Sequence, residues 1–272
     1  MLGVIAEEGL CLARVPNLSQ ARFITITAPS VLLDFSADGH TMALTDDLLR
    51  IRLQDVNTGQ VLHYLEPPQR VIGAEFSPDG RSLAVAMENL KVSLWDALTG
   101  QMLKILGGFE TAAPVYDAQF GADNRTLIWV SRARAQLMDI ATGRLGAEFR
   151  HEDFMSGVAL SPDGRTLATA AAGTVGNEYL PFVRLWDAAS GREVGTIPHP
   201  VTISGVDFSM DSRRLAVGMG RTVVFWDVDS QQRLGERQGH SDTVVDVAFS
   251  PDGQLLASAS ADGTVRLWIA RP

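Results

Sequence analysis

Cysteine is nearly absent from this sequence, since Cys11 is the only one among 272 residues. The chain therefore cannot form an intramolecular disulfide, which is compatible with a reducing compartment. Residues 1–16 lack a basic leading cluster and carry two glutamates, so they do not resemble a secretory signal. No apolar run reaches the roughly 18 residues that a membrane-spanning helix needs. These absences predict a cytoplasmic protein.

Positive charge is also scarce. The chain has 23 lysines and arginines against 32 aspartates and glutamates, which gives a formal net charge of −9. Sequence-independent binding to nucleic acid needs a basic surface, and so does binding to an anionic membrane. We therefore predict neither nucleic acid nor membrane as a partner.

Sequence signatures of catalysis are missing as well. There is no Gly-x-Ser-x-Gly elbow, no His-Glu-x-x-His zinc motif, no P-loop and no pair of Cys-x-x-Cys motifs. Gly218 and Gly220 do not indicate a dinucleotide site, because no helix is predicted after them. The sequence predicts no enzyme, no catalytic residue, no metal ligand and no cofactor.

What the sequence does contain is an internal repeat. A five-residue block, most often Phe-Ser-Pro-Asp-Gly, recurs six times at spacings of 41, 44, 40, 48 and 41 residues. A second block, most often Leu-Trp-Asp, keeps the same period. The first block occupies residues Phe35–Gly39, Phe76–Gly80, Phe120–Asn124, Leu160–Gly164, Phe208–Ser212 and Phe249–Gly253.

Each period predicts four short strands. Val245, Val247 and Phe249 alternate with the period of a half-buried strand. The Asp-Gly and Thr-Gly segments between such stretches are turn formers. One four-stranded sheet of this size cannot bury both of its faces, whereas radial stacking of such sheets buries them against each other. We therefore predict an all-β fold, a β-propeller of four-stranded antiparallel blades, as a single domain over residues 1–272.

The last period resembles a complete WD repeat, and the spacing of the whole chain is similar to that family. The Ser-Pro-Asp-Gly-Arg and Leu-Trp-Asp-Ala-x-x-Gly-Arg segments are similar to those of bacterial members. The resemblance rests on Gly239-His240, Phe249–Gly253, Leu256–Ser260, Asp262-Gly263 and Val265–Trp268. It implies a protein-interaction scaffold. It also implies a buried hydrogen-bond network of His240, Ser258, Asp262 and Trp268, a structural reading that we prefer to a catalytic His240–Asp262 pair.

The number of blades depends on how the ring closes. Residues 1–20 align without a gap on residues 82–101, so the chain starts in the middle of a repeat. We count 26 strands, two short of seven full blades. The favoured arrangement has seven blades with an incomplete first and an incomplete last blade. The alternative has six blades, with residues 20–27 as an N-terminal strand clasp. Either way, incomplete blades would allow self-association by strand addition.

The candidate binding residues lie where the resemblance puts the top face, in the turns between second and third strands and between repeats. Acidic residues collect there, and two connections, 107–114 and 172–181, are longer than a tight turn needs. Ordinary loop solvation, or loops folded over the channel mouth, would give the same pattern. Aromatic anchors within a charged rim are typical of protein interfaces. The candidates are Phe109, Glu110, Glu152, Asp153, Phe154, Glu178 and Tyr179.

Two function classes follow. We favour a non-catalytic scaffold that binds a protein or peptide, one with basic character because the face is acidic. The alternative is a metal-dependent propeller hydrolase or lactonase, with carboxylates around the central channel. The recurrent aspartates of the first block could suggest metal ligands, but their position directly before glycine favours turn formation.

Overall fold

A computed structural model describes residues 2–6, 9–13, 22–24, 31–45, 49–88, 91–107, 115–131, 133–151, 154–175, 178–250 and 252–270. Side chains are described from residue 33 onward within these ranges, except at 115–117, 174–175 and 178–179. All the regular secondary structure in these ranges is β-strand, as the repeat predicts. Over the same ranges there is no helix with the length and apolar character needed to cross a bilayer.

The strands follow the repeat closely and most have five or six residues. Their bounds are β1 (Leu2–Ala6), β2 (Gly9–Ala13), β3 (Arg22–Ile24), β4 (Val31–Phe35), β5 (Thr41–Thr45), β6 (Ile51–Asp55), β7 (Val61–Leu65), β8 (Val71–Phe76), β9 (Ser82–Met87), β10 (Lys91–Asp96), β11 (Met102–Leu106), β12 (Val115–Phe120), β13 (Thr126–Ser131), β14 (Arg134–Asp139), β15 (Leu145–Arg150), β16 (Met155–Leu160), β17 (Thr166–Val175), β18 (Glu178–Asp187), β19 (Glu193–Pro198), β20 (Ile203–Phe208), β21 (Arg214–Met219), β22 (Thr222–Asp227), β23 (Arg233–Gln238), β24 (Val244–Phe249), β25 (Leu255–Ser260) and β26 (Val265–Ile269).

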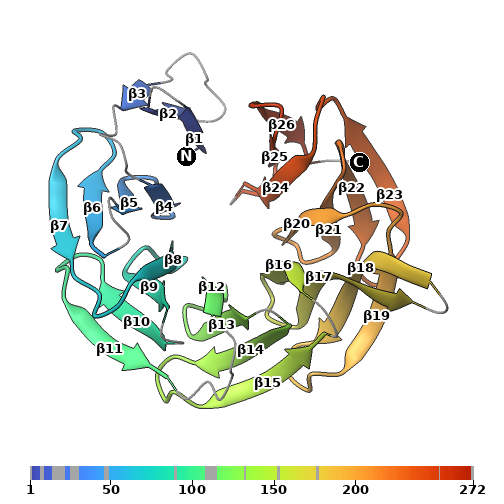
Figure 1. The fold of residues 1–272 in the computed structure, drawn as a ribbon, viewed down its shortest axis with the longest axis horizontal. Coiled ribbons are helices and arrows are strands. Elements are labelled where there is room, and N and C mark those ends of the chain that lie inside the picture. The colour runs from blue at the N-terminus through green and yellow to red at the C-terminus, as the bar shows by residue number, and fades with distance from the viewer. Residues whose placement is uncertain are drawn as a thin grey trace. The chain divides into compact units, whose positions relative to one another are not determined.

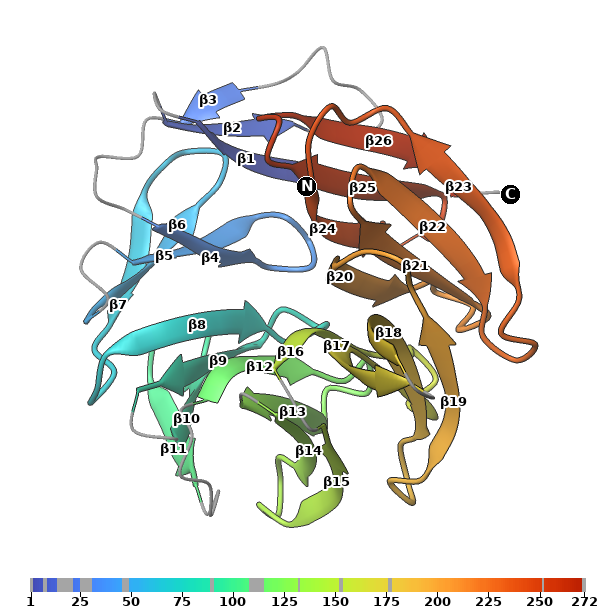
Figure 2. The same cartoon turned by 45° about the vertical axis from the view of Figure 1, so that its right-hand side comes forward.

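The strands pair in chain order into antiparallel sheets (Figure 1). The sheets β4–β7, β8–β11, β12–β15, β16–β19 and β20–β23 have four strands each, and β24–β26 has three. Figure 2 shows this last sheet with β25 between β24 and β26. These six blades confirm the predicted all-β propeller fold and its antiparallel repeat.

The N-terminal strands form a further three-stranded sheet in the order β1-β2-β3. Leu10 pairs with Ile24 and Leu12 pairs with Arg22, so β3 belongs to β2. The alternative clasp would need this stretch of chain to pair with the last blade instead. The structure thus shows six blades from β4 to β26 plus a separate small sheet, and the seven-bladed ring favoured above stays a prediction.

The turn between the first and second strands of a blade explains the recurrent aspartate. The Ser36 hydroxyl donates to Asp38 Oδ1 at 2.7 Å, and the His40 N–H donates to the same oxygen at 2.9 Å. Hydrogen bonds from Ser36 and His40 hold the pKa of Asp38 below its usual value. The same geometry recurs at Asp79, Asp163, Asp211 and Asp252.

The residue after each turn aspartate needs a left-handed backbone. Gly80 has a φ of 69° there, which glycine adopts without steric strain. Two repeats place Asn124 and Ser212 at this position, with φ values of 56° and 60°. Asparagine tolerates this region better than most residues, and serine does so less readily. The turn geometry is therefore kept even where the glycine is lost.

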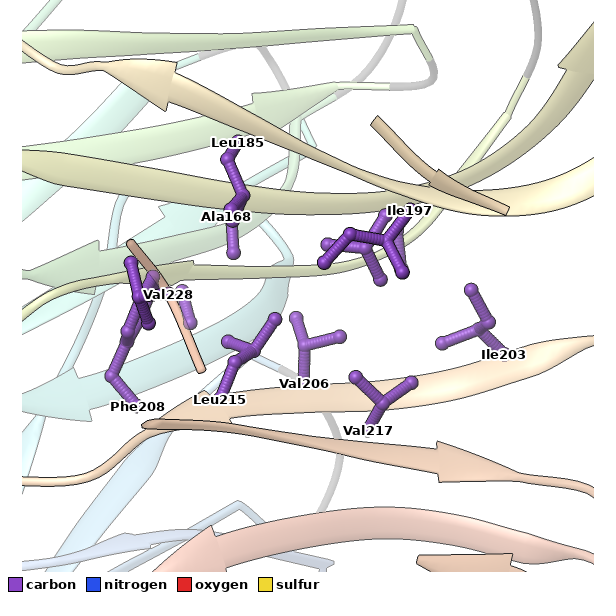
Figure 3. Packing of buried hydrophobic residues seen from close by; sticks show 12 residues of the cluster. Ala168, Leu185, Ile197, Ile203, Val206, Phe208, Leu215, Val217 and Val228 are labelled. Carbon is purple, nitrogen blue, oxygen red and sulfur yellow. The ribbon is translucent and has the colours of Figure 1, made fainter. Parts of the chain in front are cut away.

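The core lies between neighbouring sheets. The chain divides into two compact units, one made of Met1–Phe120, Asn124–Trp129 and Ile140–Gly143, the other of Gly121–Asp123, Val130–Asp139 and Arg144–Pro272. In the second unit, aliphatic side chains of β16–β19 meet those of β20 and β21 (Figure 3). In the first unit, β4–β7 packs against β8–β11 in the same way. Full burial of one such leucine or isoleucine stabilises by about 1.5–3 kcal/mol.

Candidate functional site

The predicted insertion of the fourth repeat is a paired hairpin and not a loop. The pairing of β17 with β18 continues from Ala172 and Pro181 out to Val175 and Glu178. β16 pairs with β17 only up to Ala171, and β19 pairs with β18 only from Phe182. Four residue pairs of the hairpin therefore extend past both flanking strands (Figure 1).

Local sequence favours this extension. Thr174, Val175 and Tyr179 are residue types that fit a pleated strand. Gly173 brings the two strands together closely, because a Cβ there would lie 3.1 Å from Cε1 of Phe182. The expectation of a loop was wrong for this segment, because its residues continue the pairing of β17 with β18.

The predicted partner-binding residues are only partly placed. Phe154 is about half exposed, and it directly precedes Met155, which pairs with Ala171 at the base of the hairpin. Glu178 and Tyr179 are the first residues of β18, opposite Val175 and Thr174. Phe109, Glu110, Glu152 and Asp153 lie outside the described residues.

The last blade brings together the four residues that the resemblance assigned to one network. Trp268 Nε1 donates to the Ser258 hydroxyl at 2.8 Å, and that hydroxyl lies 2.7 Å from His240 Nε2. His240 Nδ1 lies 3.0 Å from Asp262 Oδ2. The Thr264 hydroxyl and the Ser241 N–H also donate to Asp262.

These contacts define one direction of hydrogen bonding. The indole N–H of Trp268 can only donate, so the Ser258 oxygen accepts from it and the Ser258 proton points to His240. His240 Nε2 then accepts, which leaves the proton on Nδ1 to be donated to Asp262. Hydrogen bonds, of which that from Thr264 is the strongest, hold the pKa of Asp262 far below its usual value. Every member has a partner, which is what a buried polar network requires.

The fourth repeat holds a shortened version of this network. Trp186 Nε1 donates to the Thr169 hydroxyl at 2.8 Å, and the hydroxyl lies 2.7 Å from His151 Nε2. His151 Nδ1 is buried and has no hydrogen-bond partner. Gly173 stands at the position that corresponds to Asp262, so the carboxylate end of the network is missing. Burial, together with the charge of Arg184, lowers the pKa of His151 to about 4.

A third histidine at this position was missed by the sequence analysis. His199 is 2% exposed and lies edge-to-face against Trp226, with ring centroids 5.4 Å apart. Val217 stands where Thr169 and Ser258 stand in the other two blades. As a result, His199 Nε2 and Trp226 Nε1 are both buried without a hydrogen-bond partner. The signal was present, because His199 precedes Trp226 by nearly the spacing of His240 and Trp268.

Val217→Thr is expected to stabilise the protein by about 1–3 kcal/mol, because one hydroxyl would accept from Trp226 and donate to His199. Threonine has nearly the shape of valine, so packing changes little. Chemical denaturation of the two proteins at pH 7 measures the gain. Val206→Thr is the matched control, since it places a hydroxyl at another buried valine of the same cluster and should destabilise. A Val217→Thr protein no more stable than wild type would contradict the prediction.

Carboxylates on the first strands join neighbouring blades. Asp34 accepts the N–H of Phe76 at 2.7 Å, and Glu75 accepts the N–H of Phe120 at 2.9 Å. In the second unit, Asp207 Oδ2 accepts the N–H of Phe249 at 2.7 Å. Each acid directly precedes the aromatic residue of the first block. That common position could have marked them in the sequence.

Asp207 differs from the turn aspartates because it is buried. Burial raises its pKa to about 7, and the charge of Asp246 on β24 adds to the rise. Hydrogen bonds from Phe249 and Phe208 oppose this rise. Over the described residues, no three His, Cys, Asp or Glu side chains lie close enough together to hold a metal ion. We therefore describe Asp207 as a carboxyl group that ties β20 to β24.

The comparison with protein families bears on the last two blades. Residues 191–227 and 231–268 match the family model described as WD domain, G-beta repeat. These two stretches match WD40 repeats, and they lie in the last blades of the β-propeller described above. Each matched stretch runs from the fourth strand of one blade through the third strand of the next, so the WD40 unit is offset by one strand from the blade.

Similar stretches occur in several proteins of known name. A stretch of 47 residues, 17% of this chain, is 49% identical to "Apoptotic protease-activating factor 1" of Danio rerio and covers 4% of that protein. A stretch of 43 residues, 16% of this chain, is 49% identical to "Serine-threonine kinase receptor-associated protein" of Homo sapiens and covers 12% of it. For "Periodic tryptophan protein 2 homolog" of Mus musculus, 51 residues (19% of this chain, 5% of that protein) are 39% identical.

The matches therefore span only a small part of each relative's length. WD40 propellers commonly act as protein-interaction scaffolds and are generally not enzymes. The three relatives are vertebrate proteins, so they give no support to the bacterial character that the resemblance suggested.

Proposed function

We propose that this WD40 propeller is a non-catalytic scaffold that binds a protein or peptide with its top face, at the β17–β18 hairpin. The observation that carries the proposal is the projection of this hairpin past β16 and β19. A paired hairpin presents side chains on a preformed backbone, which reduces the entropy lost on binding. Phe154 supplies an exposed aromatic ring at its base.

The charge of the chain favours a partner with basic character. Glu110, Glu152, Asp153 and Glu178 surround the proposed contact region in the sequence, and the whole chain carries a net charge of −9. An acidic surface accelerates association with a basic partner and repels nucleic acid and anionic membranes. The name of one similar protein states that it associates with a receptor, which agrees with binding to another protein.

The proposal also covers the number of blades and the cellular location. We propose seven blades in one domain, with β1–β3 as a first blade that lacks its innermost strand. The three-stranded sheets β1–β3 and β24–β26 support this count. We further propose a cytoplasmic location, supported by the single cysteine.

The test combines four charge reversals, Glu110→Lys, Glu152→Lys, Asp153→Lys and Glu178→Lys. Proteins that wild type captures from a lysate of the source organism are identified and purified. Each is then titrated against wild type and against the variant with all four reversals. We expect binding to weaken at least tenfold and its salt dependence to fall, because the steering charges are gone.

A matched control reverses four acids on outer strands and turns, namely the exposed Glu66, Glu193 and Asp229 and the half-buried Glu236. It changes the net charge by the same amount, and exposed ion pairs such as that of Arg50 with Glu66 contribute little to stability. The control should retain the partner. Equal affinities of the top-face variant and the control would refute the acidic platform.

A further inference from the structure

The outer strands of the first two four-stranded blades expose an uncharged apolar surface. Both belong to the first compact unit, and in Figure 1 β7 and β11 follow each other along its outer edge. Tyr64 is 54% exposed and Leu103 is 53% exposed. We call this surface the apolar stripe, and it consists of Val61, Leu62, Tyr64, Met102, Leu103 and Ile105.

The outer strands of the other blades show that the stripe is a local feature. The position of Tyr64 and Ile105 is occupied by Thr196 in β19 and Glu236 in β23. The first position of those strands is Glu193 and Arg233. Charged residues protect an edge strand from pairing with another chain. β19 and β23 have this protection, whereas β7 and β11 lack it.

The two polar residues in the middle of β7 and β11, His63 and Lys104, do not protect these edges. His63 Nε2 donates to the backbone carbonyl of Leu98 at 2.7 Å. Lys104 Nζ donates to the backbone carbonyl of Ile140. Both side chains thus direct their donors to turns of the next sheet in the same unit. The side chains left on the outer surface of β7 and β11 are apolar.

We propose that the apolar stripe is a homodimer interface, in which β7 and β11 of two copies of this chain meet. Six such side chains expose on the order of 600 Å² per copy, close to the roughly 800 Å² that each partner of a standard interface buries. An apolar surface can pack against a second copy of itself, as a two-fold contact requires. Antiparallel outer strands can in addition hydrogen-bond along their open edges.

The net charge of the chain favours the apolar stripe over other surfaces as the place where two copies meet. Two copies that each carry −9 repel one another wherever their charged surfaces approach. Along the stripe that repulsion is smallest, and apolar burial drives association. Arg50, just before β6, lies over the ring of Tyr64 with its Cζ 5.4 Å from the ring centroid. Its ion pair with Glu66 at 3.2 Å balances this charge within one copy.

Sedimentation equilibrium of the 272-residue chain from 1 to 200 µM tests the proposal. Wild type should sediment at twice the chain mass of 29.3 kDa. Leu62→Lys with Leu103→Lys should weaken the dimer more than 100-fold. Val194→Lys with Leu234→Lys is the matched control, since these residues hold the same second position on β19 and β23 and are similarly exposed. The control should leave the dimer intact.

Three results would overturn the proposal: a monomeric wild type at 200 µM, a dimer that survives Leu62→Lys with Leu103→Lys, or a control that dissociates equally. Ile269→Lys tests self-association through β26 of the incomplete last blade instead, and a dimer that dissociates only in this variant would also overturn the proposal.

Should the stripe variant fail to fold, amide hydrogen exchange of wild type at 5 and 200 µM decides. Added protection confined to β7 and β11 supports the dimer, and its absence there refutes it.

Discussion

Replacing Ser258 by alanine is expected to lower the free energy of unfolding by about 2–4 kcal/mol. Ser258 is 1% exposed, and its hydroxyl joins Trp268 Nε1 to His240 Nε2. Alanine would leave a donor and an acceptor without partners in the last blade. Urea denaturation of both proteins at pH 7 measures the difference.

Two further variants separate the network from general effects of substitution. Ser258→Thr keeps the hydroxyl and copies Thr169 of the fourth repeat, so it should retain most of the stability. Ser241→Ala removes an exposed hydroxyl in the connection before β24 and should cost less than about 0.5 kcal/mol. If Ser258→Ala is no more destabilising than Ser241→Ala, the network contributes nothing to stability.

The network also shows how far the sequence could predict this site. His240, Ser258, Asp262 and Trp268 were identified together because all four stand in one uninterrupted repeat. His199 was missed because Val217 replaces the hydroxyl residue that makes the pattern recognisable. The backbone position that holds the histidine persists in this blade even though the hydroxyl residue is lost.

Features that depend on a neighbouring blade could not be predicted in the same way. The alternation of Val245, Val247 and Phe249 is visible in the sequence, and it predicted the strand that is β24. The contact of Asp207 with β24 is not visible there, because the N–H of Phe249 donates to it from 42 residues away. The β17–β18 hairpin was likewise recognised as an insertion, but its register depends on the strands at its base. The sequence therefore predicted the repeat and its turns better than it predicted contacts between repeats.

Acidification from pH 6.5 to 4 is expected to destabilise the native state through His151 and His199. Burial lowers the pKa of each to about 4, with further contributions from Arg184 and Arg233 respectively. In the unfolded chain the pKa of histidine is about 6.5. Between these values the unfolded state binds more protons, so the stability contribution is present above pH 6.5 and is lost as the pH falls. Each histidine accounts for up to about 3 kcal/mol.

Asp207 acts in the opposite direction over the same range. Its folded pKa of about 7 lies above its ordinary value of 3.8, so the native state binds the extra proton and gains stability as the pH falls. The wild-type pH profile is therefore a difference of opposing contributions, and it does not by itself reveal the histidines.

The difference between wild type and His199→Phe isolates one of them. The ring of His199 lies against Trp226 and Met219, so phenylalanine suits the site and removes the titrating group. Asp207 and His151 are common to both proteins and cancel. We expect the stability of His199→Phe relative to wild type to rise by about 3 kcal/mol between pH 7 and pH 4. A constant difference across that range would mean that His199 titrates alike in the folded and unfolded chains, so that its burial carries no proton linkage.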